Sequence, residues 1–125
     1  MNQKGFATLE IILMVMVIAI LATMAVPQFD KITAAANTSK VQSDLAAIQS
    51  ATAVYQMEKG AVPTYAQLTA DSSYFENGVP QAPTGKIYVE GTVTDIGTTG
   101  YGLTTDGKAT FESKTADKFT TKSSS

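Results

Sequence analysis

One apolar run dominates this chain and limits what it can fold into. Residues 11–26 are apolar throughout except for Thr23, and as a helix they would measure about 24 Å. That is short of the ~30 Å hydrocarbon core of a bilayer, whereas a helix that starts at Phe6 reaches about 31 Å. A spanning helix must therefore include Glu10, although a charge at the centre of a membrane helix costs about 2.5–3.5 kcal/mol. The sequence thus predicts a membrane-spanning helix with a carboxylate one turn inside its start.

The residues after the apolar run predict that the helix continues. Pro27 lacks the N–H of the helical ladder and clashes with the preceding turn, so it either ends the helix or kinks it. Residues 28–59 contain neither Pro nor Gly, and Gly60 supplies a stop. Apolar residues recur there at helical spacing: Phe29, Ile32, Val41, Leu45, Ile48, Ala51 and Tyr55. We therefore expect one helix from about residue 6 to 59, apolar over 6–27, amphipathic over 28–60 and kinked near Pro27.

The segment 61–125 has a different character, with more Gly and Thr and fewer apolar residues. Residues 65–70 are expected to form a short helix, and "KIYVEGTV" (86–93) alternates as a strand does. "TTGYGLTT" and "KATFES" predict a hairpin joined by a type I′ turn at Asp106-Gly107. The tail from residue 115 is polar and is expected to fray. The predicted fold is α+β, a long N-terminal helix packed on a small antiparallel sheet over about 86–111.

The composition lacks the residue types on which catalysis most often depends. The chain has no Cys and no His, and its formal net charge is −2, so thiolate metal sites, disulfides and the commonest general base are ruled out. Nor is there the clustered basic surface that nucleic acids require. Asp95 and Asp106 lie in Gly- and Thr-rich segments and would suit calcium, but solvated turn residues are the preferred interpretation. The sequence predicts no enzyme activity, no cofactor and no metal site.

Three interpretations fit residues 1–27. A secretory signal peptide would have Lys4 as its basic start and Thr23-Met24-Ala25 as a cleavage site, but Glu10 interrupts its apolar region. A simple membrane anchor explains the length but not Glu10. The third interpretation rests on a resemblance: "KGFATLE" followed by an apolar helix is similar to the N-terminus of type IV prepilins and type II secretion pseudopilins, and "GAVPTYAQL" resembles a segment that many of them carry after the helix.

The resemblance implies a processing route and an assembly contact. Residues 1–5 would be a leader that a membrane-embedded prepilin peptidase removes after Gly5, with methylation of the new N-terminal Phe6. Glu10 would then pair with the amine of Phe6 on a neighbouring copy in the apolar core of a filament, where either charge alone is costly. The resemblance places the family's helix-kinking proline at Pro27 and implies loosening of the helix within residues 19–27 in the filament.

The family contains subunits of different machines. This chain lacks the disulfide-bounded loop of many pilins, and "PQAPTGKIYV" stands where major pseudopilins commonly carry a Pro-Trp-Gly block. The second absence favours a major pilin that lies in the inner membrane with lipid around it, and that then polymerises with copies of itself through the pilus assembly machinery into an extracellular filament. The alternatives are a periplasmic pseudopilin of a type II secretion or DNA-uptake system, and a membrane-anchored binding protein that never polymerises.

Overall fold

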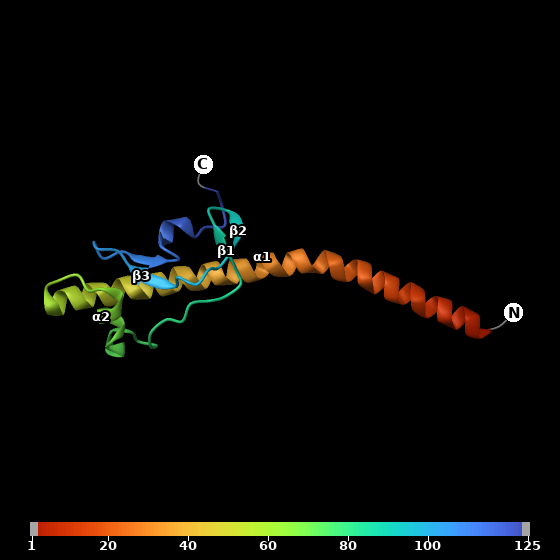
Figure 1. Ribbon diagram of the computed structural model, residues 1–125, viewed down its shortest axis with the longest axis horizontal. Coiled ribbons are helices and arrows are strands. Elements are labelled where there is room, and N and C mark those ends of the chain that lie inside the picture. Colours follow the sequence, from red (N-terminus) through yellow and green to blue (C-terminus); the bar gives the residue numbers. More distant parts are fainter. Residues whose placement is uncertain (1–2, 124–125) are drawn as a thin grey trace.

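The computed structural model describes residues 3–123, with the side chains at 24–28, including that of Pro27, outside the description. Its elements are, in chain order, α1 (Gln3–Lys59), α2 (Tyr65–Thr69), the 3₁₀ turn η1 (Ser72–Tyr74), β1 (Lys86–Val89), β2 (Thr92–Asp95), β3 (Tyr101–Leu103), β4 (Ala109–Phe111), β5 (Lys114–Thr115) and the 3₁₀ turn η2 (Ala116–Lys118). Figure 1 shows that all elements after α1 gather on the C-terminal half of that helix. The predicted α+β architecture and the short helix near residue 65 are confirmed.

Helix α1 runs unbroken for 57 residues and therefore passes through Pro27. The axis bends gently along its orange and red part, and the N-terminal half extends away from the rest of the chain (Figure 1). Pro27 has no N–H for the carbonyl of Thr23, four residues before it. The Thr23 hydroxyl itself donates to the Ile20 carbonyl (2.7 Å). The alternative in which Pro27 ends the helix is wrong.

The strand predicted over residues 86–93 is instead a hairpin. Strands β1 and β2 pair antiparallel, with Val89 opposite Thr92. The two residues between them, Glu90 (φ 48°) and Gly91 (φ 85°), have the positive φ values of a type I′ turn. The alternating pattern of "KIYVEGTV" therefore covers two strands and the turn between them. The Glu-Gly pair at that turn is not a strong turn signal, so the sequence predicted a single strand. These two strands form a sheet of their own, separate from the three-stranded sheet in the order β3-β4-β5.

The hairpin predicted at residues 98–113 exists, but its turn differs. Leu103 pairs with Ala109, so five residues separate the strands. The N–H of Gly107 donates to the Thr104 carbonyl (3.0 Å), and Gly107 alone of the loop has positive φ. Asp106 thus sits inside a four-residue turn over 104–107 that Gly107 closes, so the prediction of a two-residue type I′ turn is wrong.

The first residues of the polar tail pack against the rest of the chain. Residues Glu112 and Ser113 turn the chain with positive φ, and β5 pairs with β4. Phe119 is 1% exposed, and backbone bonds tie Lys118 and Thr120 to the β1–β2 turn. The expectation that the tail frays from residue 115 is therefore wrong, because one buried aromatic side chain anchors an otherwise polar segment.

The core lies between one face of α1 and the two sheets. Val41, Leu45, Ile48 and Ala51 of α1 are buried, as the helical spacing predicts. Opposite them the rings of Tyr101, Phe111 and Phe119 pack in sequence, with centroids 5.1 and 5.7 Å apart. Phe29 and Ile32, which the same spacing placed on this face, are exposed because the sheets begin to cover α1 only at Ala34.

Candidate functional site

The N-terminal half of α1 is an apolar helix that nothing in the chain covers. Residues Gln3–Thr23 have a mean hydropathy of 2.5, and none of this 21-residue segment is buried. Phe6 is 52% exposed and Ile18 is 65% exposed. Among the described residues it is the one segment long and apolar enough to cross a membrane, by length and composition alone.

Glu10 lies on this apolar helix beside a shallow groove of about 480 Å³. The groove is lined by Glu10, Leu13, Met14, Val17 and Ile18. Within the described part of the chain the Glu10 carboxylate makes no ion pair or side-chain hydrogen bond, and every other side chain that lines the groove is aliphatic or a thioether. A cation that docks here would therefore meet one carboxylate in an apolar setting, where charge pairs are least screened.

Phe6 lies one turn before Glu10. Four residues correspond to about 6 Å along the axis, on the same side of the helix. In the uncut chain the nitrogen of Phe6 belongs to a peptide bond, since α1 already begins at Gln3. The structure thus brings Phe6 and Glu10 to one side of α1, and a cationic amine at Phe6 requires removal of residues 1–5.

Gly5 has no conformational reason to be glycine in this fold. A Cβ at this position would meet nothing within 4 Å, and its φ is not positive. Glycine in a helix interior is about 1 kcal/mol less favourable than alanine. Close by, the Thr8 hydroxyl donates to the Lys4 carbonyl (2.9 Å) and supports the helical turn that contains Gly5. The packing of the described chain therefore does not require glycine at this position.

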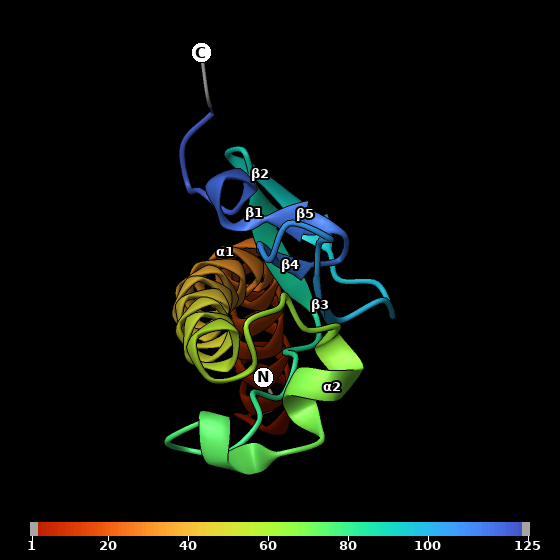
Figure 2. The ribbon, with the colours of Figure 1, turned by 90° about the vertical axis from the view of Figure 1, so that its left-hand side faces the viewer.

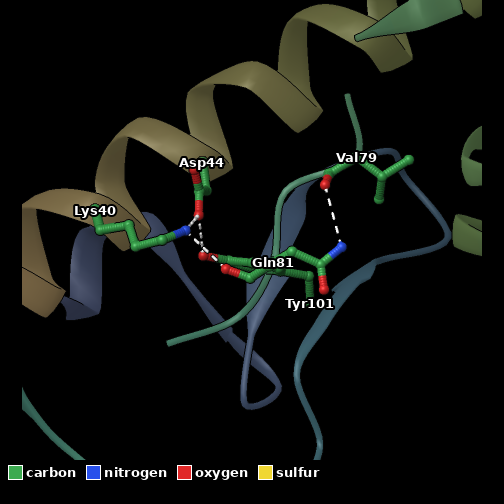
Figure 3. A network of polar contacts seen from close by, with 5 residues as sticks. All are labelled: Lys40, Asp44, Val79, Gln81 and Tyr101. Atoms are coloured by element: carbon green, nitrogen blue, oxygen red, sulfur yellow. Dashed lines mark hydrogen bonds and ion pairs between the residues drawn. The ribbon is translucent and has the colours of Figure 1, made fainter. Parts of the chain in front are cut away.

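The C-terminal half of α1 and the elements that pack on it, here called the globular part, contain a polar network that the sequence did not predict. Asp44 accepts hydrogen bonds from Lys40 (2.5 Å) and from the Tyr101 hydroxyl (2.5 Å), and Lys40 also donates to the Gln81 carbonyl (2.7 Å) (Figure 3). The network joins α1, β3 and the loop before β1. Burial and then the Asp44 carboxylate raise the pKa of Tyr101. The four-residue spacing of Lys40 and Asp44 was the available signal, but it indicates only a surface pair.

The same region contains a second set of polar contacts from α1. Asn37 donates to the carbonyls of Thr84 (3.1 Å) and Lys86 (2.7 Å), and the Thr38 hydroxyl accepts from the Tyr88 N–H (3.0 Å). These side chains satisfy the edge of β1 that β2 does not pair. The β1–β2 hairpin is therefore fixed to α1 by hydrogen bonds as well as by apolar contacts.

Asp95 and Asp106, which the sequence analysis considered as calcium ligands, each interact with a different side chain. Asp95 pairs with Lys86 (2.5 Å) at the end of the β1–β2 ladder. Asp106 accepts from the Thr104 hydroxyl within its turn, and this hydrogen bond lowers the pKa of Asp106. No group of three or more acidic, His or Cys side chains suited to a metal occurs among residues 3–123.

Comparison with known proteins gives three relatives. The chain is 35% identical to the type IV narrow pilus major component PilA5 of Thermus thermophilus over 71 residues, which are 57% of this chain and 61% of that protein. It is 32% identical to the type II secretion system core protein G of Klebsiella pneumoniae over 102 residues, 70% of this chain and 73% of that protein. The core protein G of Klebsiella michiganensis is 35% identical over 66 residues, 46% of its length. For the Thermus and Klebsiella michiganensis proteins, the chain thus spans less than two thirds of the relative's length.

No family model matches the chain, and no solved structure matches it. The relatives are named as a major component of a narrow type IV pilus and as core proteins of type II secretion systems.

Proposed function

The chain belongs to the family of type IV pilins and type II secretion pseudopilins, and from this premise we propose that it is the major subunit of a type IV pilus-like surface filament. The observation that carries the proposal is the uncovered apolar half of α1 with one carboxylate near its start. Such a surface is stable in lipid and, once out of lipid, only against other apolar surfaces.

Processing is the first step of the proposed route. The precursor lies in the inner membrane through the apolar half of α1, and prepilin peptidase cuts after Gly5 and methylates Phe6. The open space around Gly5 supports this, because a Cβ there would meet nothing within 4 Å and packing in the fold therefore does not account for the glycine. Proteolysis needs an extended segment, and a glycine lowers the cost of unwinding the first helical turn.

Assembly is the second step. Once Phe6 carries a cationic amine, that amine docks beside Glu10 of a neighbouring copy, in the groove formed by Leu13, Met14, Val17 and Ile18. Both charges would be costly alone in an apolar core, and their pairing recovers much of that cost. A register in which the amine misses the carboxylate leaves both charges unpaired. The pair therefore selects the correct docking position rather than adding net affinity.

A second candidate within the family is the major pseudopilin of a type II secretion system. The observation that favours it is the longer match to the Klebsiella pneumoniae core protein G, which covers 70% of this chain against 57% for the Thermus pilin. The apolar helix and the charge pair would act in the same way, but the filament would stay in the periplasm.

Two measurements test the proposal. Intact mass and N-terminal mapping of native protein should give a chain that starts at a methylated Phe6. A chain that starts near residue 26 would indicate a signal peptide, and a retained Met1 would leave only an anchor. Negative-stain microscopy of sheared cell surfaces should then show long fibres containing this chain. A processed chain without surface fibres at normal expression would favour the pseudopilin.

A further inference from the structure

The dipeptide Asn77-Gly78 lies in the loop between η1 and β1, and both of its residues are exposed. Figure 2 shows the green segment that follows α2 at the outer edge of the molecule, away from β1 and β2. An asparagine before a glycine is prone to ring closure, because the glycine nitrogen can attack the asparagine side chain and no glycine side chain hinders the attack. The sequence contains three asparagines, and only Asn77 precedes a glycine.

The side-chain amide of Asn77 is not held in place by the fold. Among residues 3–123 it has no hydrogen-bond partner. Asn37 is the opposite case, because its side chain donates to the carbonyls of Thr84 (3.1 Å) and Lys86 (2.7 Å). The nitrogen of Thr38, which would have to attack Asn37, belongs to the middle of α1. The chain therefore contains one unrestrained asparagine and one restrained asparagine in the same molecule.

The backbone nitrogen of Gly78 is also accessible. Its N–H donates to the Phe75 carbonyl at 3.3 Å, which is beyond the usual range of about 2.7–3.2 Å for such a hydrogen bond. A Cβ at Gly78 would meet nothing within 4 Å, so the space beside this residue is open. Its φ of 82° is one that glycine adopts readily and other residues do not.

The loop is fastened on either side of the dipeptide rather than at it. Before it, the Phe75 ring is 6% exposed and packs in the core. After it, the Gln81 carbonyl accepts a hydrogen bond from Lys40 (2.7 Å) (Figure 3). Between these two points the backbone can rotate at Asn77 and Gly78 without breaking a contact in the core, and ring closure requires such a rotation.

We propose that Asn77 is a site of spontaneous deamidation through a succinimide. The Gly78 nitrogen loses its proton and attacks the side-chain carbonyl carbon of Asn77, and a new C–N bond forms. The side-chain nitrogen takes up that proton and leaves as ammonia, which completes a five-membered imide. Water then adds to either carbonyl of the ring and breaks its C–N bond, which leaves aspartate or isoaspartate at position 77. Water is the only co-reactant, and no atom is oxidised or reduced.

The reaction changes the charge of a groove along α1. Asn77 lines this groove of about 650 Å³ together with Lys40, Asp44 and Glu76. The new carboxylate therefore joins two acidic side chains and one lysine, and it adds a negative charge to a chain whose formal net charge is already −2. Isoaspartate also lengthens the backbone by one methylene inside the turn over 75–78. The inference goes beyond the proposed function, because the reaction needs only this chain and water.

Peptide mapping by mass spectrometry tests the proposal on the full-length chain, dispersed in detergent and incubated at mildly alkaline pH. The Asn77 peptide should exchange NH for O at least about tenfold faster than the Asn37 peptide, a barrier difference of about 1.4 kcal/mol. The rate should rise with pH, because the Gly78 nitrogen must lose its proton. Both products should form, and isoaspartate is recognised because a protease that cuts before aspartate does not cut there.

The matched control is Asn77→Gln, which keeps an uncharged amide but would have to close a six-membered ring. We expect this variant to stay unmodified over the same period and to unfold at the same temperature as the wild type, because the side chain at position 77 has no hydrogen-bond partner to lose. Equal conversion of Asn77→Gln and wild type at this position would overturn the inference, since ring size would then have no effect.

Three further results would overturn it. Conversion of Asn37 at the same rate as Asn77 would show that the fold makes no distinction between them. An unchanged Asn77, under conditions in which a free peptide of residues 72–82 is converted, would show that the loop keeps the reacting atoms apart. Aspartate without isoaspartate would indicate direct hydrolysis rather than a ring. Because no filament is needed, these results do not depend on the proposed function.

Discussion

Removal of the Tyr101 hydroxyl tests the network that fastens the globular part to α1. In Tyr101→Phe the ring stays against Phe111, but Asp44 loses one of its two donors (2.5 Å). Hydrogen bonds to charged groups contribute about 1.5–3 kcal/mol. The lower end applies here, because the Asp44 side chain keeps Lys40 and is 18% exposed, so water can replace the lost donor. We expect a loss of about 1.5 kcal/mol in the free energy of unfolding, or about 6–12 °C in Tm for a domain of this size.

The assay is thermal unfolding of the detergent-dispersed full-length chain, followed by the near-ultraviolet circular dichroism of tyrosine. The Asp44→Ala variant should lose more, because it leaves the buried hydroxyl without an acceptor and Lys40 without its anion. A double-mutant cycle then isolates the pair. The reasoning is refuted if Tyr101→Phe unfolds within about 0.3 kcal/mol of wild type, or if the two substitutions are additive, since either result would show that the contact carries no stability.

Three further predictions concern other parts of the chain. Phe119→Ala should lower the free energy of unfolding by about 3–5 kcal/mol, because a fully buried ring is removed from the core; urea unfolding measures it. Gly5→Ala should leave the circular dichroism and Tm unchanged, because the new Cβ meets nothing, but should block removal of the leader, as read by intact mass. Because the pKa of Tyr101 is raised in the folded state by burial and by Asp44, the folded chain holds that proton more tightly than the unfolded chain. That contribution to stability is complete below about pH 10 and falls as the pH rises above it. When Tm is measured at a series of alkaline pH values, it should fall less steeply with pH for Tyr101→Phe than for the wild type.

The sequence predicted the parts of the fold that depend on long, uninterrupted patterns. The α1 helix followed from the absence of Gly and Pro over 28–59, and its buried face followed from the spacing of Val41, Leu45, Ile48 and Ala51. The same spacing failed at Phe29 and Ile32, because periodicity shows which side of a helix is apolar but not how far along it the sheets extend. Those two residues are exposed, since they precede Ala34, the first residue of α1 that the rest of the chain buries.

The turns were less predictable, because they depend on backbone conformations that side chains signal weakly. Glu90, Glu112 and Ser113 adopt positive φ without being glycine, and so the β1–β2 and β4–β5 hairpins were missed. The buried Phe119 was missed because one aromatic residue in a polar tail has no periodicity to support it.

The candidate site depended on a different kind of information. The roles of Gly5, Phe6 and Glu10 came from a resemblance to a family rather than from spacing. The structure shows an exposed Glu10 in an apolar groove and open space around Gly5, and the partners proposed for these two residues are other molecules. The Asp44–Tyr101 contact joins residues 57 positions apart, and no local pattern in the sequence brings these two together.

The most direct test of the account is the filament yield of the Glu10→Val variant. Membrane insertion should be intact or improved, since an apolar residue replaces a costly charge, and cleavage after Gly5 should proceed. The amount of protein in filaments pelleted from sheared cells should fall sharply relative to the amount in the membrane, because an arriving Phe6 amine finds no partner in the apolar groove. Processing is checked on the same blot. Glu10→Gln should be nearly as damaging, because it keeps the shape and removes the charge. A normal filament yield from fully processed Glu10→Val protein would contradict the account and leave Glu10 without a part in assembly.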